Sequence, residues 1–231
     1  MQTRYLEAEA ALVRSEGLAL AGGDWEALSR LYLPLQEARR QRRQRCGEGV
    51  VRLDLLAEGL TDPLDARRLI EQYPHGQLLV AGWGSIEPAV RVRALAAERG
   101  LYVETFLAAV YPFGSGRAVV IVPLEGVRLP PPDPQPIEHL LAQLPPHCRV
   151  LSENELRRGE RPGTYHTYGE VMAMWERLHA PYLAAAEMEA DLVRKIESCR
   201  RTIRADYACE LAHQKLSAAS RELARRSPGT P

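Results

Sequence analysis

The sequence is short of lysine, of aromatic residues and of long apolar runs. Lys195 and Lys215 are the only lysines among 30 lysines and arginines, and aromatic side chains account for 6% of the 231 residues. No window approaches the roughly 18 consecutive apolar residues that a membrane helix needs. The opening segment MQTRYLEAEAALVRSEG has acidic residues where a secretory signal has its apolar core. We therefore expect a soluble cytoplasmic protein with no membrane partner.

The sequence also lacks a net charge and a cysteine framework. The 30 Lys and Arg residues balance 30 Asp and Glu residues, so no overall field attracts the chain to nucleic acid or to an anionic membrane. The four cysteines, Cys46, Cys148, Cys199 and Cys209, have no paired CxxC spacing, which favours free thiols over a disulfide framework or a zinc ribbon. The cysteine spacing therefore predicts no metal site, and no sequence motif predicts a cofactor.

The first 46 residues have the pattern of a helical hairpin. Apolar or small residues recur at alternating spacings of four and three before the break AGGD, namely Leu6, Ala10, Val13, Gly17 and Leu20. A second helix follows Asp24, a candidate N-cap, and Pro34 within it predicts a kink or a new helix start. Its expected inner face consists of Leu28, Leu31, Leu35 and Ala38.

Residues 50–152 alternate β-rich and helical segments, which predicts an α/β domain. The strand-like runs VVRLDLLA and QLLVAG enclose a helix that we expect to begin at Asp62 and Pro63. Its predicted inward residues are Ala66, Leu69, Ile70 and Tyr73. A further helix over 86–99, ended by Gly100, leads to two β-rich runs joined by the hairpin signal PFGSG. The predicted fold class is α/β: a central mixed sheet with a parallel crossover and a β-hairpin, flanked by amphipathic helical hairpins from both ends of the chain.

A proline-rich connector and a helical segment complete the chain. The prolines of LPPPDPQP, residues 129–136, lack the backbone donor, so this stretch is expected to be extended. A short helix, a strand at CRVLS and the polar loop ENELRRGERPGTYHT follow. Residues 165–226 carry three apolar stripes: Val171, Met174, Trp175 and Leu178; Leu192, Ile196, Cys199 and Ile203; and Cys209, Ala212, Leu216, Ala219 and Leu223. Because narrow apolar faces are unstable alone in water, we expect 165–226 to pack on 1–46 and to clasp the α/β domain.

One C-terminal segment, KIESCRRTIRADYACELAHQKLSAA at 195–219, carries a family resemblance. Its features are Ile196 and Glu197 at the start, Ile203 near the end of a helix, Asp206 and Tyr207 at the turn, and Leu216 before the small Ser217. In these features the segment resembles the junction between two tetratricopeptide repeats. It departs from the family at Cys199, where an aromatic residue is usual, and at Tyr207, where proline is expected. No series of repeats at a period of about 34 residues is present. The resemblance implies helical hairpins that present a groove to a partner, and it transfers no binding residues.

A glycine-containing loop, Gly82, Trp83, Gly84 and Ser85, joins a predicted strand to a predicted helix. Open α/β sheets bind ligands at the carboxyl ends of parallel strands, and the first amides of a helix attract anions. The loop lacks the third glycine of a dinucleotide fingerprint and the Lys-Ser/Thr of a P-loop, and Glu87 would repel an anion. The loop is therefore interpreted either as a ligand site or as a structural turn that brings Trp83 to the surface.

The densest run of charge is RRQRRQR, which supplies five arginines: Arg39, Arg40, Arg42, Arg43 and Arg45. Such a run can contact nucleic acid phosphates, or it can solvate the end of a helix, where cations favour the C-terminal dipole. No aromatic residues are interleaved for base stacking, and the chain is neutral overall. The pattern therefore favours a solvated helix end over a nucleic acid site.

Two Cys-His pairs have the residue types of a metal site or of a nucleophile with its base. Cys209 and His213 lie one helical turn apart, but both are on or beside an apolar stripe, and two ligands do not make a metal site. His147 and Cys148 are adjacent in sequence, and neighbours on a strand point to opposite faces, so they do not form a nucleophile and its base. Neither pair predicts a catalytic residue.

No set of acid, base, nucleophile and metal ligands converges in this sequence. Together with the tetratricopeptide-like junction, this predicts a non-enzymatic protein-interaction or scaffold module that recruits a protein partner or self-associates. The alternative is a small-molecule or nucleotide-binding α/β protein, including an enzyme, with its site at residues 82–87.

Overall fold

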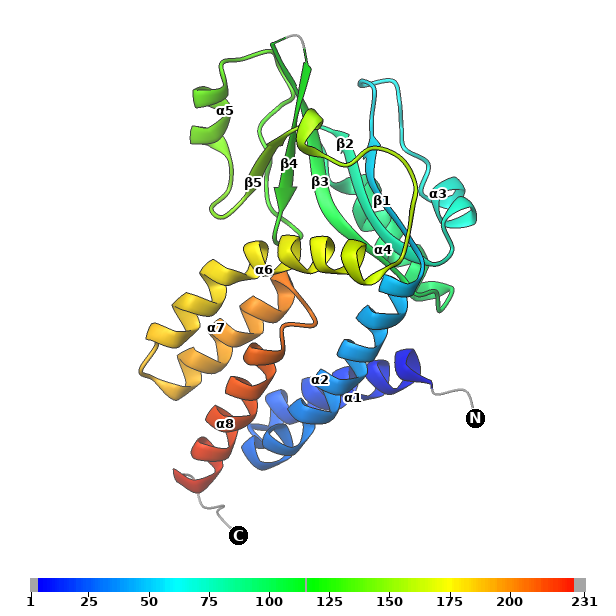
Figure 1. Cartoon of the computed structure of the whole chain (residues 1–231). Helices are drawn as coiled ribbons and strands as arrows, with labels where there is room; N and C mark the ends of the chain where they lie inside the picture. The colour runs from blue at the N-terminus through cyan, green and yellow to red at the C-terminus, as the bar shows by residue number, and fades with distance from the viewer. Residues whose placement is uncertain (1–3, 115, 227–231) are drawn as a thin grey trace. The chain divides into compact units, whose positions relative to one another are not determined.

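The computed structural model describes residues 4–114 and 116–226. The chain divides into two units: Arg45–Met174, called the α/β unit, and Met1–Gln44 with Trp175–Pro231, called the helical unit. The chain passes from one unit to the other inside two helices, α2 (Trp25–Glu48) and α6 (Tyr165–Met188), which Figure 1 labels. Among the described helices, none is long and apolar enough to cross a membrane.

The α/β unit is built on a six-stranded sheet with the order β5-β4-β3-β2-β1-β6, of which Figure 1 labels β1 to β5. Its strands are β1 (Val50–Leu56), β2 (Gly76–Trp83), β3 (Val103–Phe113), β4 (Gly116–Val122), β5 (Arg149–Ser152) and β6 (Arg161–Pro162). The first three run parallel, and β4, β5 and β6 each pair antiparallel to their neighbours. The predicted α/β class, with a mixed sheet, parallel crossover and β-hairpin, is confirmed.

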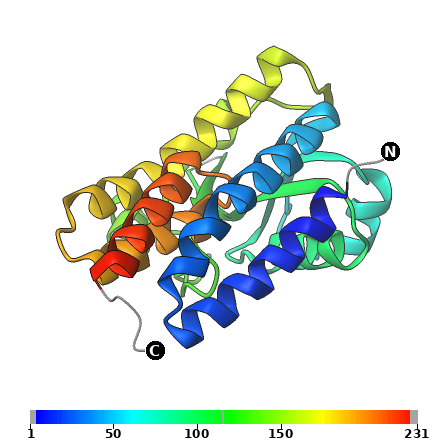
Figure 2. The ribbon, with the colours of Figure 1, turned by 90° about the horizontal axis from the view of Figure 1, so that it is seen from below.

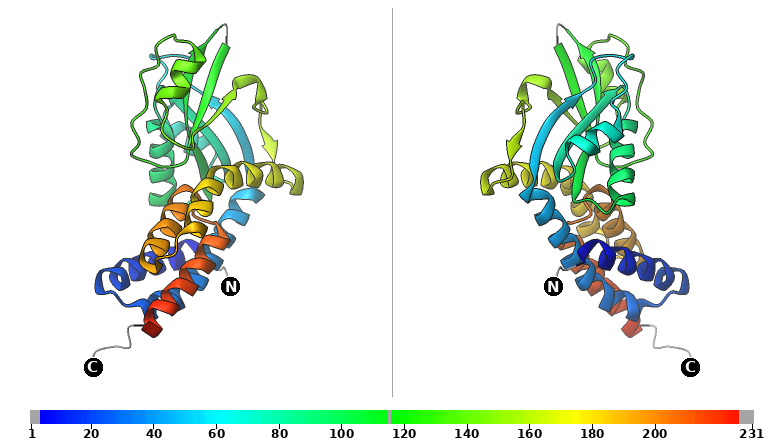
Figure 3. Two further views of the ribbon diagram at one scale, coloured as in Figure 1. Left: turned by 90° about the vertical axis from the view of Figure 1, so that its left-hand side faces the viewer. Right: turned by 90° about the vertical axis from the view of Figure 1, so that its right-hand side faces the viewer.

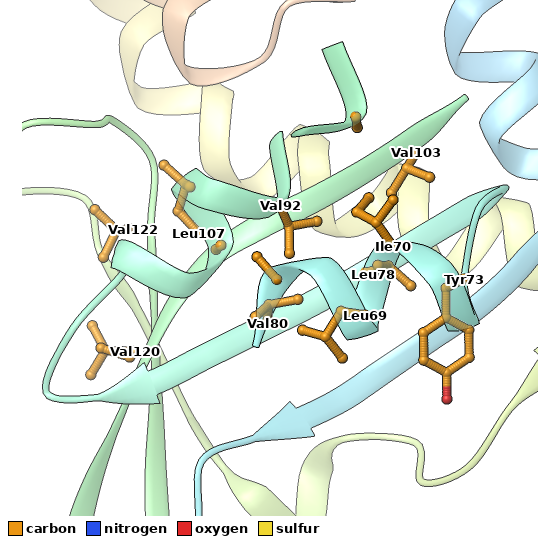
Figure 4. Packing of buried hydrophobic residues seen from close by; sticks show 14 of the residues in the cluster. Leu69, Ile70, Tyr73, Leu78, Val80, Val92, Val103, Leu107, Val120 and Val122 are labelled. Carbon is orange, nitrogen blue, oxygen red and sulfur yellow. The ribbon is translucent and has the colours of Figure 1, made fainter. Parts of the chain in front are cut away.

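Two parallel crossovers place their helices on one face of the sheet. Helix α3 (Ala66–Gln72) joins β1 to β2, α4 (Glu87–Glu98) joins β2 to β3, and the two helices pack against each other (Figure 3). Figure 4 shows the core between them and the sheet, with Leu69 and Ile70 from α3 facing Leu78 and Val80 of β2. The four residues predicted to face inward from α3 are all buried: Ala66, Leu69, Ile70 and Tyr73. Each large apolar side chain buried in this way stabilises the unit by about 1.5–3 kcal/mol.

The start of α3 differs from the prediction. Asp65 is its N-cap, because the Asp65 carboxylate accepts a hydrogen bond from the Arg67 amide at 2.9 Å. The Asp62 carboxylate instead accepts from the Glu58 amide at 2.9 Å and closes the preceding loop. The predicted start at Asp62 and Pro63 is therefore wrong.

The polar loop after β5 is more ordered than its sequence indicates. It contains a 3₁₀ turn, η1 (Glu153–Glu155), and the two-residue strand β6, which pairs with β1 at Val50 and Val51. Before the loop, the short helix α5 (Ile137–Gln143) follows the proline-rich connector. A two-residue strand has no periodicity, so the sequence pattern did not predict it.

Gly163 lies where two backbone segments of the α/β unit meet, its own and residues 47–49. A Cβ atom on Gly163 would lie 2.2 Å from the Gly47 carbonyl oxygen and 2.5 Å from that of Gly49. Because backbone cannot swing aside as a flexible side chain can, even one methyl group requires the chain to move. Gly163 is therefore required for the close approach of the strand β6 region to the end of α2.

Replacing Gly163 by alanine is expected to destabilise the α/β unit by about 1–3 kcal/mol. The measurement is urea unfolding with hydrogen-exchange mass spectrometry of the β1 and β2 peptides. Gly169→Ala is the matched control, since Gly169 is an exposed residue of α6 with nothing within 4 Å of an added Cβ. It is expected to be neutral or to stabilise by up to about 1 kcal/mol. Equal effects of the two substitutions would contradict the close-approach argument.

The helical unit joins both ends of the chain in one core. Helices α1 (Tyr5–Gly22), α2, the second half of α6, α7 (Leu192–Ala205) and α8 (Glu210–Arg226) make it up (Figure 2). The core combines Leu28 and Leu35 of α2 with Ile196 of α7 and Leu216 of α8. The predicted inner face of α2 is buried throughout, as Leu28, Leu31, Leu35 and Ala38. Asp24 caps α2 by accepting a hydrogen bond from the Ala27 amide at 2.9 Å.

One prediction for this unit is wrong, and one of the two outcomes predicted at Pro34 is excluded. The predicted stripe of α1 is not its buried face, because Val13 is 40% exposed whereas Glu9 and Ala19 are buried. The reason is that Glu9 pairs with arginines of α2, which turns a charged position inward. In addition, α2 runs through Pro34 without a break, so no new helix starts there. Buried leucines on both sides of Pro34 offset the backbone hydrogen bond that the proline removes.

Candidate functional site

Backbone amides of the loop at residues 82–87 donate hydrogen bonds to acceptors of the protein itself. The Gly84 amide donates to the Val110 carbonyl at 2.9 Å, and the Ser85 amide donates to the Gly82 carbonyl at 3.4 Å. The Ser85 hydroxyl accepts from the Glu87 amide at 3.1 Å, although the N-cap of α4 is Ile86. These amides are therefore engaged by protein acceptors, in β3 for Gly84 and in the loop for Ser85 and Glu87.

The proline-rich connector lies against this loop. A Cβ on Gly84 would lie 2.7 Å from Pro132, and Gly84 has φ +60°, a conformation that favours glycine. Trp83 ends β2 beside Val110 and is half-buried. These contacts favour the interpretation of Gly82, Trp83, Gly84 and Ser85 as a structural turn. A pocket of about 550 Å³ in this unit lies instead between α3 and α4, and its lining includes none of the four residues.

The five arginines of the charged run divide between surface and interior. Arg40 and Arg45 are half-exposed and pair with Glu37 and Glu48 on the same helix, as expected of a solvated helix surface. The other three turn into the helical unit, where Arg39 is 8% and Arg43 2% exposed. Buried guanidinium groups are unavailable to nucleic acid phosphates, so the structure does not bring the five residues together as one basic surface.

The first buried ion cluster is centred on Asp206, in the turn between α7 and α8. Its carboxylate lies 2.7 Å from Arg43 Nη1 and 2.6 Å from His179 Nδ1, and it accepts the Ala208 amide at 3.1 Å. The Arg43 guanidinium stacks on the rings of Trp175 and Tyr207, each 4.8 Å from the ring centroid. This stacking suits arginine, whose planar guanidinium is less strongly hydrated than an ammonium group.

Two cations share the single carboxylate of Asp206. Burial alone would lower the pKa of His179, but hydrogen bonds with Asp206 and Cys209 outweigh burial and raise this pKa to about 9. His179 is therefore an imidazolium at neutral pH. Burial raises the pKa of Asp206, but Arg43 and His179 outweigh it, so the net direction is down and the carboxylate stays ionised. The cluster thus has the charges needed to hold α2, α6 and the α7–α8 turn together.

The second buried cluster joins α1, α2 and α8. Glu9 accepts from Arg39 Nε at 3.1 Å and from Arg42 Nη1 at 3.0 Å. Arg39 Nη1 also lies 3.1 Å from His213 Nε2, and since arginine only donates, that nitrogen must accept. His213 Nδ1 then carries the proton and donates to the Cys209 carbonyl at 2.8 Å. Burial and the Arg39 charge lower the pKa of His213 to about 4, so this imidazole is neutral.

The Cys-His candidates stay structural. Both ring nitrogens of His213 are engaged, so neither is open to a metal. Cys209 is 5% exposed, and burial raises the pKa of the Cys148 thiol to about 11, which keeps Cys148 protonated. Within the described residues, no group of three or more His, Cys, Asp and Glu side chains is placed to hold a metal ion.

A groove of about 620 Å³ runs along the seam of α2 and α8 in the helical unit. Its lining residues are Glu26, Ser29, Arg30 and Leu33 of α2 and Arg221, Ala224 and Arg225 of α8. Leu33 is 48% exposed. The groove was not predicted residue by residue, although the tetratricopeptide resemblance implied a groove between helices.

Comparisons with known proteins found no match to this chain among family models, curated proteins or solved structures. The resemblance of residues 195–219 to tetratricopeptide repeats therefore stays a prediction. In the structure, Asp206 and Tyr207 lie at the turn between two helices, where the resemblance places them.

Proposed function

We propose that this protein is a non-enzymatic interaction or scaffold module and that the α2/α8 groove of its helical unit is the surface that binds a protein partner. The observation that carries the proposal is the groove itself, whose lining combines a half-exposed leucine with three arginines. Apolar anchors with arginine nearby are the residue types that dominate protein interfaces.

The walls of the groove are held in place before any partner binds. The Ser217 hydroxyl of α8 donates to the Ser29 carbonyl of α2 at 2.7 Å, and Arg39 of α2 contacts His213 of α8. Near the surface, the Gln36 amide donates to Glu210 at 3.4 Å. A preformed surface loses less conformational entropy on binding than a mobile one, so more of the contact energy remains as affinity.

The proposal is tested by affinity capture with the full chain from its host cells, comparing the native protein with Leu33→Glu. Leu211→Glu is the control, because Leu211 is 51% exposed on α8 but does not line the groove. A partner that the native chain and Leu211→Glu retain, and that Leu33→Glu loses, supports the proposal. A partner retained by all three proteins would place the interaction elsewhere and overturn the role of the groove.

The alternative function, ligand binding at residues 82–87, has less support. Three amides of the loop already donate to protein acceptors, and Pro132 packs on Gly84. A Gly84→Val variant would disturb the turn itself, so Ser85→Ala is the cleaner test of ligand binding. If a nucleotide or metabolite raises the melting temperature of the native chain but not of Ser85→Ala, the alternative gains the support that it lacks.

A further inference from the structure

The α2/α8 groove has an excess of positive charge. Three of its lining residues are arginines, Arg30, Arg221 and Arg225, and one is an acid, Glu26. The whole chain is neutral, so this excess is local to the groove. A partner that brings carboxylates to the groove would be attracted, and one that brings lysines and arginines would be repelled.

The arginines of the groove can form ion pairs with carboxylates of a partner. Arg30 pairs with Glu26 and Arg225 with Glu222, in both cases between exposed side chains of one helix. Such surface pairs are marginal in water, so a partner carboxylate can replace the helix's own glutamate at little cost. Arg221 has no carboxylate within ion-pair distance among the described residues. It can therefore pair with a partner carboxylate without breaking an existing ion pair.

The dimensions of the groove limit what fits. From Glu26 to Leu33 along α2 the lining spans eight residues, about 10 Å at the rise of an α-helix, or two helical turns. Three of the lining residues, Leu33, Ser29 and Ala224, are apolar or small and suit contact with one or two apolar side chains. An amphipathic helix that places apolar residues one turn apart on these residues has flanking positions that face the arginines.

We infer that the α2/α8 groove binds an acidic amphipathic helix of a partner protein. Its apolar residues cover Leu33 and Ala224, and its Asp or Glu side chains pair with Arg221 and Arg225. This inference rests on the proposed function and adds the chemical class of the partner. An interface of two helical turns is well below about 1,200 Å², so we expect micromolar, transient and salt-sensitive binding.

The test uses the immobilised full chain to select from a displayed library of helical peptides with fixed apolar spacing and randomised flanking positions. Selected peptides are expected to be enriched in Asp and Glu at the flanking positions. Their affinity, measured by fluorescence anisotropy, should fall at least tenfold for Arg221→Glu and for Leu33→Glu. It should also fall on going from low to high salt. Arg201→Glu, an exposed arginine of α7 outside the groove, should bind as the native chain does.

The outcomes separate this inference from the proposed function. Selected peptides without acidic enrichment, or peptides that bind Arg221→Glu as well as the native chain, overturn the acidic-helix inference. If Leu33→Glu still loses its partner in cells, the proposed function stands and only the partner class is wrong. Self-association of the native chain that Leu33→Glu abolishes would identify the occupant as a second copy of the chain and would likewise overturn the acidic helix.

Discussion

Replacing Asp206 by alanine is expected to lower the unfolding free energy of the helical unit by about 3–5 kcal/mol. The substitution leaves the Arg43 guanidinium, which is 2% exposed, without the carboxylate 2.7 Å away, and it leaves the His179 imidazolium without its acceptor. An uncompensated buried charge costs more than a lost exposed ion pair, because water cannot replace the missing partner.

The measurement is hydrogen-exchange mass spectrometry of the α7 and α8 peptides, combined with urea unfolding of the full chain. Glu197→Ala is the matched control, because Glu197 also contacts two cations, Arg200 and Arg204, but from a half-exposed position. It is expected to cost less than about 1 kcal/mol. If Asp206→Ala costs no more than Glu197→Ala, the cluster does not stabilise the unit.

A double substitution separates the net contribution of the Arg43–Asp206 pair to stability from the cost of leaving one buried charge without its partner. Arg43→Met together with Asp206→Ala removes the buried cation as well as the carboxylate. The pair of changes is therefore expected to cost less than the sum of the two single changes. Strict additivity would show that Arg43 and Asp206 do not interact in solution.

The α/β unit could be predicted from local patterns because its elements follow the period of their own residues. The runs around Leu78 and Val120 alternate with helices whose apolar residues recur every three or four positions, and Gly100 ends α4 at φ +62°. The errors in this unit lie where two acids compete for one helix start, as at Asp62 and Asp65. Either carboxylate can cap a helix, and only the path of the chain decides which one does.

The charged interior of the helical unit could not be predicted, because its partners lie far apart in the sequence. Arg39 contacts Glu9 at a separation of 30 residues and His213 at a separation of 174. A local pattern assigns a dense arginine run to the surface, since charged side chains are rarely buried without a partner. The exception arises because α1 and α8 supply those partners. Two residues of the sequence signal that arginines are buried here. They are Glu9, inside the apolar N-terminal pattern, and Asp206, in an otherwise helical segment.

The stability of the helical unit is expected to pass through a maximum near pH 6.5, because its two buried histidines are perturbed in opposite directions. The pKa of His179 is about 9 when folded, above the ordinary 6.5, so its contribution is complete below pH 6.5 and is lost as the pH rises through 9. The pKa of His213 is about 4 when folded, below the ordinary 6.5, so the unfolded chain takes up a proton first as the pH falls. Its contribution is therefore complete above pH 6.5 and is lost as the pH falls toward 4. Each change corresponds to up to about 3 kcal/mol.

Each side of this pH profile is assigned to one histidine, which a substitution can test. His179→Gln should remove the loss between pH 6.5 and 9, because the charge that is lost there is no longer present, and His213→Gln should remove the loss between pH 6.5 and 4. His166→Gln, an 81% exposed histidine of the α/β unit, should leave both slopes in place.

Protection factors of the α7 and α8 amides, corrected for intrinsic exchange at each pH, provide the measurement. A native profile that is flat from pH 4 to pH 9, or one that His179→Gln and His213→Gln leave unchanged, would show that these imidazoles do not control the stability of the unit. A maximum that disappears one side at a time would instead assign the alkaline side to the Asp206 cluster and the acidic side to the contact between Arg39 and His213.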